Sequence, residues 1–339
     1  MAGERFFEEV AVVGPEHGGE RLDRFAAGAF PDYSRSFLQK AIKDGEVTLN
    51  EGEAKPSTPV APGDVVRARM PALVEPSLEP EAIPLDILFE DEHLLAINKP
   101  ANLVCHPARG AARGTLANAL LAHCRSLSDL NGPLRPGIVH RLDRDTTGVI
   151  LAAKTNAAHA GLAAQFEARS VEKQYLAIVR GRMEFDEDEI AFAIGRDPRV
   201  REKMSVRSLE GRASLSRYRV VERFARFTFV RVRLLTGRTH QARVHLSAIG
   251  HPVAADSAYG GGALTPSEAL GEPAAPGEEP LITRQALHAA EIAFRHPVTG
   301  EAMRIEAPLP EDMRRALEAL RQGAARKGRP NPEGAARRD

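Results

Sequence analysis

The chain has 339 residues and a formal net charge of zero, from 46 basic and 46 acidic side chains, and 43% of its residues are apolar. This length allows two domains, and the apolar content is typical of a globular protein rather than a disordered or fibrous one. No window approaches the roughly 18–20 apolar residues that a membrane-spanning helix needs. The acidic start, MAGERFFEEV, lacks the features of a signal peptide, and two cysteines cannot form a disulfide framework. We therefore expect a cytoplasmic protein that does not associate with a membrane.

The zero net charge hides an uneven distribution of charge along the chain. Residues 100–260 carry 25 basic and 15 acidic side chains, and the other segments together carry the matching acidic surplus. Arginine side chains match phosphate oxygens in geometry, and the release of counterions drives cationic surfaces onto nucleic acids. The basic segment is therefore compatible with a phosphate-bearing partner, although an ordinary solvated surface explains the surplus equally well.

Residues 15–70 form a small predicted unit. Ser34 is a good N-cap for its second helix, and Gly45 stands where that helix should end. Residues 71–84 are rich in proline and glutamate, which predicts a linker. In chain order, the apolar spacing of the unit predicts helices over 19–30 and 34–44 and strands over 47–49 and 65–68.

Residues 85–322 form a second predicted unit, in which strand-like and helical stretches follow one another irregularly. From residue 323 to 339 the chain is basic and punctuated by glycine and proline, which predicts a disordered tail. Strand-rich stretches with irregularly placed helices favour an α+β fold with a mixed or antiparallel sheet over a regular βαβ series. In chain order, the pattern predicts a hairpin over 85–100, a helix over 116–124, strand-like ends around a polar centre over 137–154, a helix over 157–168, a strand over 175–180, two paired strands over 217–235, a helix over 239–249, an exposed loop over 263–280, a hairpin over 288–305 and a helix over 311–321.

Three polar clusters are candidates for a functional site. The densest is HRLDRDTTG, residues 140–148, between two apolar runs; its structural alternative is a charged turn with local backbone hydrogen bonds. The second is GRTHQARVH, residues 237–245, where helical spacing puts His240 and Arg243 on a similar side; its alternative is a capped helix with a polar face. The third is KQY, residues 173–175, whose tyrosine could instead pack in the core.

Other combinations of reactive residues point less clearly to a site. The pairs Cys105-His106 and His123-Cys124 look like metal ligands, but zinc sites normally show tighter paired spacing. Residues 260–262 are glycines without the context of a phosphate loop, and the chain has no dinucleotide or Walker-type fingerprint. A glycosidase could use Asp143 and Asp145 as its two carboxylates, but a chain with no tryptophan and 4 tyrosines offers few sugar-stacking surfaces. We therefore expect no metal and no cofactor.

Taken together, the clusters resemble the motifs of the RluA family of pseudouridine synthases, enzymes that isomerise uridine in RNA. The resemblance covers about residues 85–310 and implies a pseudouridine-synthase fold with a mixed, mainly antiparallel central sheet and flanking helices. Residues 15–70 are similar to the alpha-L RNA-binding module, which implies a small N-terminal α/β unit. The matching stretches are INKPANLVCHP (97–107), GIVHRLDRDTTGVILAAKT (137–155), KQYLAIVRG (173–181) and TGRTHQARVH…GHPVAADSAYG (236–260).

The resemblance identifies Asp143 as the catalytic aspartate, which acts at the anomeric carbon of the ribose either as a nucleophile or by assisting formation of a glycal. An aspartate in a partly dry pocket needs a nearby cation to stay ionised, and the resemblance assigns that cation to Arg243. It assigns Tyr175 to the active site, where its ring can stack on the base.

The resemblance also implies substrate-binding residues. Arg141 would enter the space that the everted base leaves, and His140 and Arg238 would bind the substrate near it. The structural alternative for Arg141 is an ion pair with Asp145.

The expected partner is RNA. LVCHP and GIVHRLDRDTTG are most similar to the family branch that modifies large-subunit ribosomal RNA, although transfer RNA stays open. No redox step is needed, which agrees with the expectation of no cofactor. We expect a monomer in the cytoplasm. The alternative function is a non-catalytic RNA-binding ribosome assembly factor built on the same scaffold.

Overall fold

The computed structural model describes residues 6–71, 78–107, 111–200, 202–208 and 210–327. The chain divides into two compact units, with the boundary between residues 75 and 76. None of the described helices is long and apolar enough to cross a membrane.

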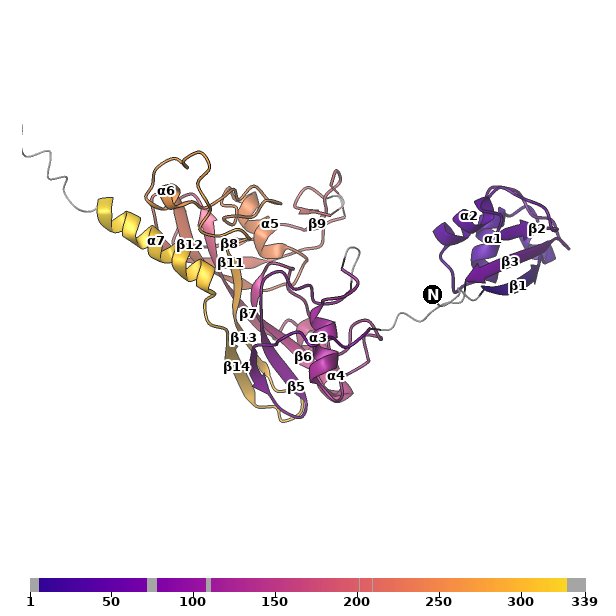
Figure 1. The fold of residues 1–339 in the computed structure, drawn as a ribbon, viewed down its shortest axis with the longest axis horizontal. Coiled ribbons are helices and arrows are strands. Elements are labelled where there is room, and N and C mark those ends of the chain that lie inside the picture. Colours follow the sequence, from indigo (N-terminus) through magenta and orange to yellow (C-terminus); the bar gives the residue numbers. More distant parts are fainter. Residues whose placement is uncertain (1–5, 72–77, 108–110, 201, 209, 328–339) are drawn as a thin grey trace, which may run out of the picture. The chain divides into compact units, whose positions relative to one another are not determined.

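The N-terminal unit combines two helices with a three-stranded antiparallel sheet of order β1-β3-β2 (Figure 1). The hydroxyl of Ser34 accepts a hydrogen bond from the N–H of Phe37, and Gly45 follows the second helix with a φ of +77°, so both predicted caps are confirmed. The sequence analysis missed the first strand, because its side chains are mostly exposed and its place depends on pairing with β3. The elements are β1 (Phe6–Val12), a 3-10 turn (Pro15–His17), α1 (Leu22–Ala29), α2 (Arg35–Lys43), β2 (Val47–Leu49) and β3 (Val65–Pro71).

Within the described residues, the second unit is built on a nine-stranded sheet of order β4-β5-β6-β13-β7-β12-β11-β8, with β14 also paired to β13. The pair β6–β13 is parallel and the other neighbours are antiparallel, which confirms the expected mixed, mainly antiparallel sheet. A small ribbon of β9 (Gly195–Arg196) and β10 (Met204–Ser205) stands apart from this sheet. The strands of the large sheet are β4 (Ile87–Glu90), β5 (Leu94–Lys99), β6 (Thr147–Ala153), β7 (Glu172–Arg180), β8 (Glu187–Ile190), β11 (Ser216–Arg223), β12 (Phe227–Leu234), β13 (Leu287–Arg295) and β14 (Ala302–Glu306).

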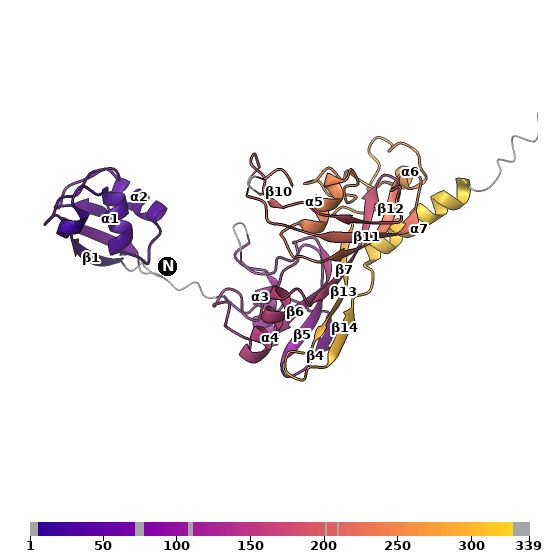
Figure 2. The same cartoon turned by 180° about the vertical axis from the view of Figure 1, so that it is seen from behind.

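The helices of the second unit gather at two ends of the sheet. In both views α3 and α4 lie beside β5 and β6, whereas α5, α6 and α7 lie toward β11 and β12 (Figures 1 and 2). Tyr175 packs against two of the hydrophobic clusters, one containing β12 and α5 and the other containing β5 and α3. The centre of the sheet is therefore where the two ends of the unit meet. The helices are α3 (Leu116–His123), α4 (Asn156–Glu167), α5 (Gln241–Ala248), α6 (Pro266–Ala269) and α7 (Glu311–Lys327).

The predicted linker, 71–84, differs partly from the structure. Residues 72–77 lie outside the described residues, but the segment that follows is attached to the second unit. The side-chain amide of Asn118, on α3, donates to the carbonyl of Glu79, and the N–H of Glu81 donates to the carbonyl of Asn118. The last part of the predicted linker is thus held against α3 by hydrogen bonds.

Two predictions near the polar clusters are wrong in detail. Residues 137–139 do not form a strand, since only Ile138 makes a bridge, to Ala152, and Gly137 turns the chain with a φ of +68°. The helix predicted from residue 239 begins at Gln241, because His240 has left-handed backbone angles that an α-helix does not contain.

The segments around 263–280 and 323–339 also differ from the prediction. The first contains the short helix α6, capped by Thr265 and partly buried, rather than only an exposed loop. The second begins inside a helix, since α7 continues to Lys327; residues 328–339 lie outside the described residues. A Cβ on Gly323 would lie 2.2 Å from the carbonyl oxygen of Ala269. Small residues that suggested a flexible chain thus allow α6 and α7 to pack closely.

Replacing Gly148 by alanine should destabilise the protein by more than about 2 kcal/mol. Gly148 has a φ of +110°, and a Cβ would lie 2.1 Å from the carbonyl oxygen of Ala289, in the parallel pair β6–β13. Gly250→Ala is the matched control, because Gly250 also has a positive φ but faces open space. Urea denaturation should give a clearly larger fall in midpoint for Gly148→Ala; equal falls would contradict the steric argument.

Candidate active site

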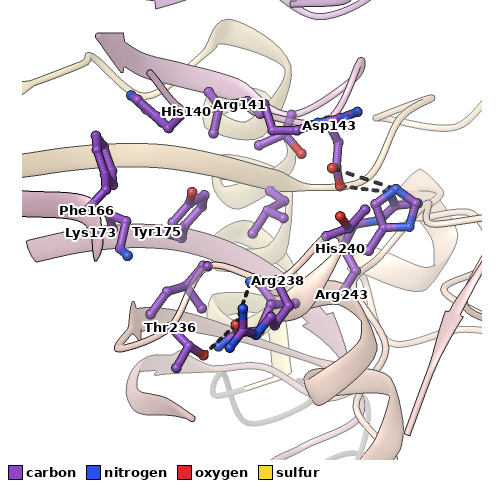
Figure 3. A pocket seen from close by; sticks show the side chains of 18 of the residues that line it. His140, Arg141, Asp143, Phe166, Lys173, Tyr175, Thr236, Arg238, His240 and Arg243 are labelled. Carbon is purple, nitrogen blue, oxygen red and sulfur yellow. Dashed lines mark hydrogen bonds and ion pairs between the residues drawn. The ribbon is translucent and has the colours of Figure 1, made fainter. Parts of the chain in front are cut away.

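A cavity of about 480 Å³ lies between the loop before β6, the beginning of β7 and the segment from β12 to α5 (Figure 3). This volume is within the range of small-molecule sites, about 300–1,000 Å³. The structure brings together every site residue that the sequence predicted, from segments far apart in the chain. The predicted residues that line the cavity are His140, Arg141, Asp143, Tyr175, Arg238 and Arg243.

One guanidinium joins two carboxylates at the edge of the cavity. Nη1 of Arg243 donates to Oδ2 of Asp143 at 2.9 Å, while its Nε and Nη2 donate to the two carboxylate oxygens of Asp256 at 2.7 and 2.9 Å. Burial opposes the charge of Arg243, but the hydrogen bonds and charges of the two aspartates outweigh it and raise its pKa. Asp256 is buried, whereas Asp143 keeps 17% of its side chain exposed. The arrangement holds one carboxylate beside a permanent cation and open to the cavity.

A buried lysine fixes the loop that carries Asp143. Lys99 is fully buried at the end of β5, and its Nζ donates to the carbonyls of Pro100, Leu103 and Arg144 at 2.8, 2.9 and 2.8 Å. Burial lowers the pKa of Lys99 to about 8. Because Arg144 follows Asp143 directly, this contact limits how far the aspartate can move.

A tyrosine lines the cavity next to these charges. Tyr175 lies on β7, paired with Val232 of β12 and Ala289 of β13. Burial raises the pKa of its hydroxyl, and the nearby charge of Asp143 raises it further. The side chain is therefore a neutral phenol, which can offer a ring face and a hydroxyl proton but is a poor proton acceptor.

His140 and Phe166 form another part of the wall. The N–H of Leu151 donates to Nε2 of His140 at 2.9 Å, so this nitrogen carries no proton and the ring is neutral with its proton on Nδ1. Burial lowers the pKa of His140 to about 3. The ring lies 4.7 Å from that of Phe166, measured between centroids. Nε2 of His140 therefore accepts a backbone hydrogen bond and is not available to a ligand.

The two predicted substrate-binding arginines differ in their surroundings. Arg141 is exposed and makes no ion pair with a described carboxylate, so the alternative pair with Asp145 is not formed; Asp145 accepts a hydrogen bond from the N–H of Asn102. Arg238 is partly buried, and its Nε has no hydrogen-bond partner among the described residues. Both cations are therefore available to an anionic ligand at the cavity.

The alternative chemistries lack the geometry that they need. Asp145 does not line the cavity and so is not paired with Asp143 as a second glycosidase carboxylate would be. Cys105 Sγ donates to the carbonyl of Leu142, and His123 contacts Glu90. No cluster of three or more metal-ligating side chains occurs among the described residues.

Comparison with known proteins gives the family. A model described as RNA pseudouridylate synthase matches residues 93–248, and an S4 domain model matches residues 20–66. The chain is 44% identical to the ribosomal large subunit pseudouridine synthase D of Pseudomonas aeruginosa, over 93% of this chain and 96% of that protein. An uncharacterised RNA pseudouridine synthase of Bacillus subtilis is 41% identical, over 91% of this chain and 96% of that one.

The chain belongs to the RNA pseudouridylate synthase family. It is an enzyme of the isomerase class that acts on uridine in RNA, with an S4 domain at its N-terminal end. The solved structure of human RNA Pseudouridylate Synthase Domain Containing 4 is similar, with a TM-score of 0.53, 26% identity and coverage of 70% of this chain and 93% of that one. The structural similarity agrees with the family assignment.

The sequence analysis of this pseudouridine synthase missed three groups at the site. Asp256 completes the partners of Arg243, Lys99 anchors the aspartate loop, and Tyr259 contacts both Arg243 and His240. All three lie inside stretches quoted for the resemblance, so they were visible, but nothing in their spacing marked them. A lone aspartate or lysine reads as solvated until the tertiary structure buries it.

Proposed function

We propose that this pseudouridine synthase modifies uridines of large-subunit ribosomal RNA and that Asp143 is its catalytic aspartate. The similarity to the ribosomal large subunit pseudouridine synthase D of Pseudomonas aeruginosa, 44% identical over most of both chains, supports the choice of RNA. The observation that carries the choice of aspartate is the ion pair between Asp143 and Arg243 at 2.9 Å in a cavity of nucleotide-compatible size. The hydrogen bond from Arg243 holds the carboxylate in place beside a permanent cation.

The reaction breaks the bond between N1 of uracil and C1′ of ribose and forms a bond between C5 and C1′. Asp143 can attack C1′, which displaces uracil as an anion and leaves an ester on the aspartate, or it can remove the C2′ proton, which leaves a glycal. In either route the free base turns in the cavity and C5 bonds to C1′: in the first route the ester bond to Asp143 breaks as this bond forms, and in the second, where uracil left as an anion when the glycal formed, the protonated Asp143 returns its proton to C2′. The C5 proton is then lost and N1 gains a proton, so that the product is an isomer of the substrate.

Tyr175 holds the base in this proposal. A uracil stacked on an aromatic ring gains about 1–3 kcal/mol, and Tyr175 lines the same cavity as Asp143. Since burial raises the pKa of its hydroxyl, Tyr175 keeps its proton, and stacking and hydrogen-bond donation suit it better than removal of the C5 proton.

The cations of the cavity bind the RNA around the everted nucleotide. Arg141 is exposed and unpaired with the described carboxylates, so it can enter the gap left in the strand and contact phosphate or neighbouring bases. Arg238 lines the cavity, so its guanidinium can contact the substrate. His140 keeps its Nδ1 proton and can donate to a carbonyl acceptor.

We further propose that residues 15–70 act as a separate RNA-binding module and residues 85–322 as the catalytic domain, and that the protein works as a monomer in the cytoplasm. The separate matches of an S4 domain model to residues 20–66 and of the RNA pseudouridylate synthase model to residues 93–248 support the division into two modules.

The proposal is tested by mapping pseudouridines across total RNA from cells with and without this protein. We expect one or a few sites in large-subunit ribosomal RNA to disappear in its absence and to return with the wild-type chain but not with Asp143→Asn. Loss of sites only in transfer RNA would refute the proposed substrate. Return of the sites with Asp143→Asn would refute the proposed aspartate, and tight RNA binding without any pseudouridine would favour the non-catalytic alternative.

A further inference from the structure

A chain of contacts leads from Met204 through Tyr259 and His240 to Asp143. The hydroxyl of Tyr259 accepts from the N–H of Met204, on β10, at 3.0 Å, and lies 2.7 Å from Nδ1 of His240. Nε2 of His240 lies 3.7 Å from Oδ1 of Asp143. Figure 3 shows His240 beside Asp143 and Arg243. The imidazole therefore stands between a fixed phenol and the proposed catalytic carboxylate.

These contacts favour one tautomer of His240. The Tyr259 hydroxyl oxygen already accepts a hydrogen bond from Met204. The hydroxyl can donate its own proton to Nδ1 of His240, which lies 2.7 Å away. Nδ1 is then an acceptor, so the neutral ring carries its proton on Nε2. That N–H is directed to the side where Oδ1 of Asp143 lies.

The two oxygens of Asp143 are consequently unequal. Oδ2 accepts a hydrogen bond from Arg243 at 2.9 Å. Oδ1 has the N–H of His240 at 3.7 Å, which is longer than a hydrogen bond and leaves its lone pairs open to the cavity. Oδ1 is thus the oxygen with less of its charge neutralised.

The backbone of His240 is held in an uncommon conformation. Its φ of 57° and ψ of 19° are left-handed, and its side chain does not cap α5, although it stands at the N-cap position. Gln241 fixes the turn, since its Oε1 accepts from the N–H of Arg238 and from the hydroxyl of Thr236. Such a conformation in a residue other than glycine has an energetic cost, and it persists where the surrounding structure enforces it. Here it directs the ring toward the carboxylate instead of toward the helix end.

We propose that His240, fixed by Tyr259 as the Nε2–H tautomer, is a positioning residue that orients Asp143 so that Oδ1 is the oxygen that acts on the ribose. This inference rests on the proposed function of Asp143. Arg243 holds Oδ2 by a hydrogen bond of 2.9 Å, and the N–H dipole of His240, with Nε2 at 3.7 Å from Oδ1, favours the carboxylate rotamer that keeps Oδ1 toward the cavity. The small ribbon of β9 and β10 supports the arrangement through Met204.

The charged and titratable groups around His240 agree with a neutral ring. Burial lowers the pKa of His240 and the positive charges of Arg243 and Arg141 lower it further, whereas Asp143 and Asp256 raise it, and the net pKa is lower than usual. Tyr259, whose own pKa is raised by burial, remains a proton donor. If the ring were protonated, Nδ1 of His240 would carry a proton and could no longer accept a hydrogen bond from the Tyr259 hydroxyl.

Substitution of His240 by side chains of different length separates its contact with Tyr259 from its contact with Asp143. In His240→Gln, the amide reaches the position of Nε2 and can donate to Asp143. In His240→Asn, the amide ends near the position of Nδ1 and can bond only Tyr259. We expect His240→Asn to lower the single-turnover rate on an unmodified large-subunit ribosomal RNA transcript by about 100-fold, the usual effect of misplacing a reacting group by about 1 Å.

The matched variants are compared by rate at saturating enzyme, by Kd for the transcript and by melting temperature. We expect His240→Gln to retain a rate within about 10-fold of wild type, Tyr259→Phe to fall between the two, and all Kd values to stay within twofold. Equal loss in His240→Gln and His240→Asn, or a loss that follows melting temperature, would overturn the inference, as would a normal rate in His240→Asn. A wild-type enzyme that forms no pseudouridine in this RNA would instead refute the proposed function.

Discussion

Asp143→Asn should lower the rate of pseudouridine formation by about 10⁴-fold or more, the scale seen when a group that takes part in covalent chemistry is removed. An amide neither attacks C1′ nor removes the C2′ proton. The variant should still fold, because Arg243 keeps both hydrogen bonds to Asp256 and the loop keeps its contact with Lys99. The measurements are the single-turnover rate on an unmodified large-subunit ribosomal RNA transcript and the Kd of the variant for that transcript.

Asp145→Asn is the matched control for Asp143→Asn. It makes the same chemical change two residues away, on a side chain that does not line the cavity and that accepts from the N–H of Asn102 through an oxygen that the amide retains. We expect its rate to stay close to that of wild type. Substantial activity in Asp143→Asn, or an equal loss in Asp145→Asn, would contradict the assignment of Asp143.

The second large effect is expected for Arg243→Met, which should lose both activity and stability. The substitution leaves the carboxylates of Asp143 and Asp256 close together without their cation. Removing one member of a buried ion pair costs about 3–5 kcal/mol, and Asp143 also loses the hydrogen bond from Arg243 that holds its carboxylate at the cavity. The urea concentration at the midpoint of unfolding and the single-turnover rate should both fall clearly.

The double variant Arg243→Met with Asp256→Asn separates the two effects. Replacing the buried carboxylate by an amide removes the uncompensated charge, so part of the lost stability should return. Activity should not return, because Asp143 still lacks its cation. Recovery of the rate together with stability would show that Arg243 acts only as a structural residue and would contradict its proposed role at the aspartate.

The expected site and the observed site can be compared residue by residue. The clusters 140–148, 173–175 and 237–245 were identified because each concentrates polar side chains next to apolar runs, and residues from all three line one cavity. His140 shows the limit of this reasoning. Its place in the densest cluster suggested a ligand contact, but one of its nitrogens accepts from the backbone of Leu151. Whether a polar side chain serves the fold or a ligand depends on neighbours that its own segment does not contain.

The segment 263–280 shows the same limit for secondary structure. Its glycines, prolines and alanines predicted an exposed loop, yet part of it is the partly buried helix α6. The low side-chain volume that suggested flexibility is what lets Ala269 approach Gly323 of α7. Composition alone does not distinguish an open loop from a close contact between backbones, because both favour small residues.

Local sequence signals were enough to predict the elements with strong periodicity, such as the helix capped by Ser34 and the two strands on either side of 224–226. The hydrogen bonds and caps of these elements lie within a few residues of one another in the chain. The tertiary structure decided the partners of the site. Asp143 and Arg243 are 100 positions apart in the chain, and Asp256, Met204 and Tyr259 join them through contacts between loops and strands that are distant in sequence. Contacts between distant residues arise from strand pairing and burial, which no local pattern encodes.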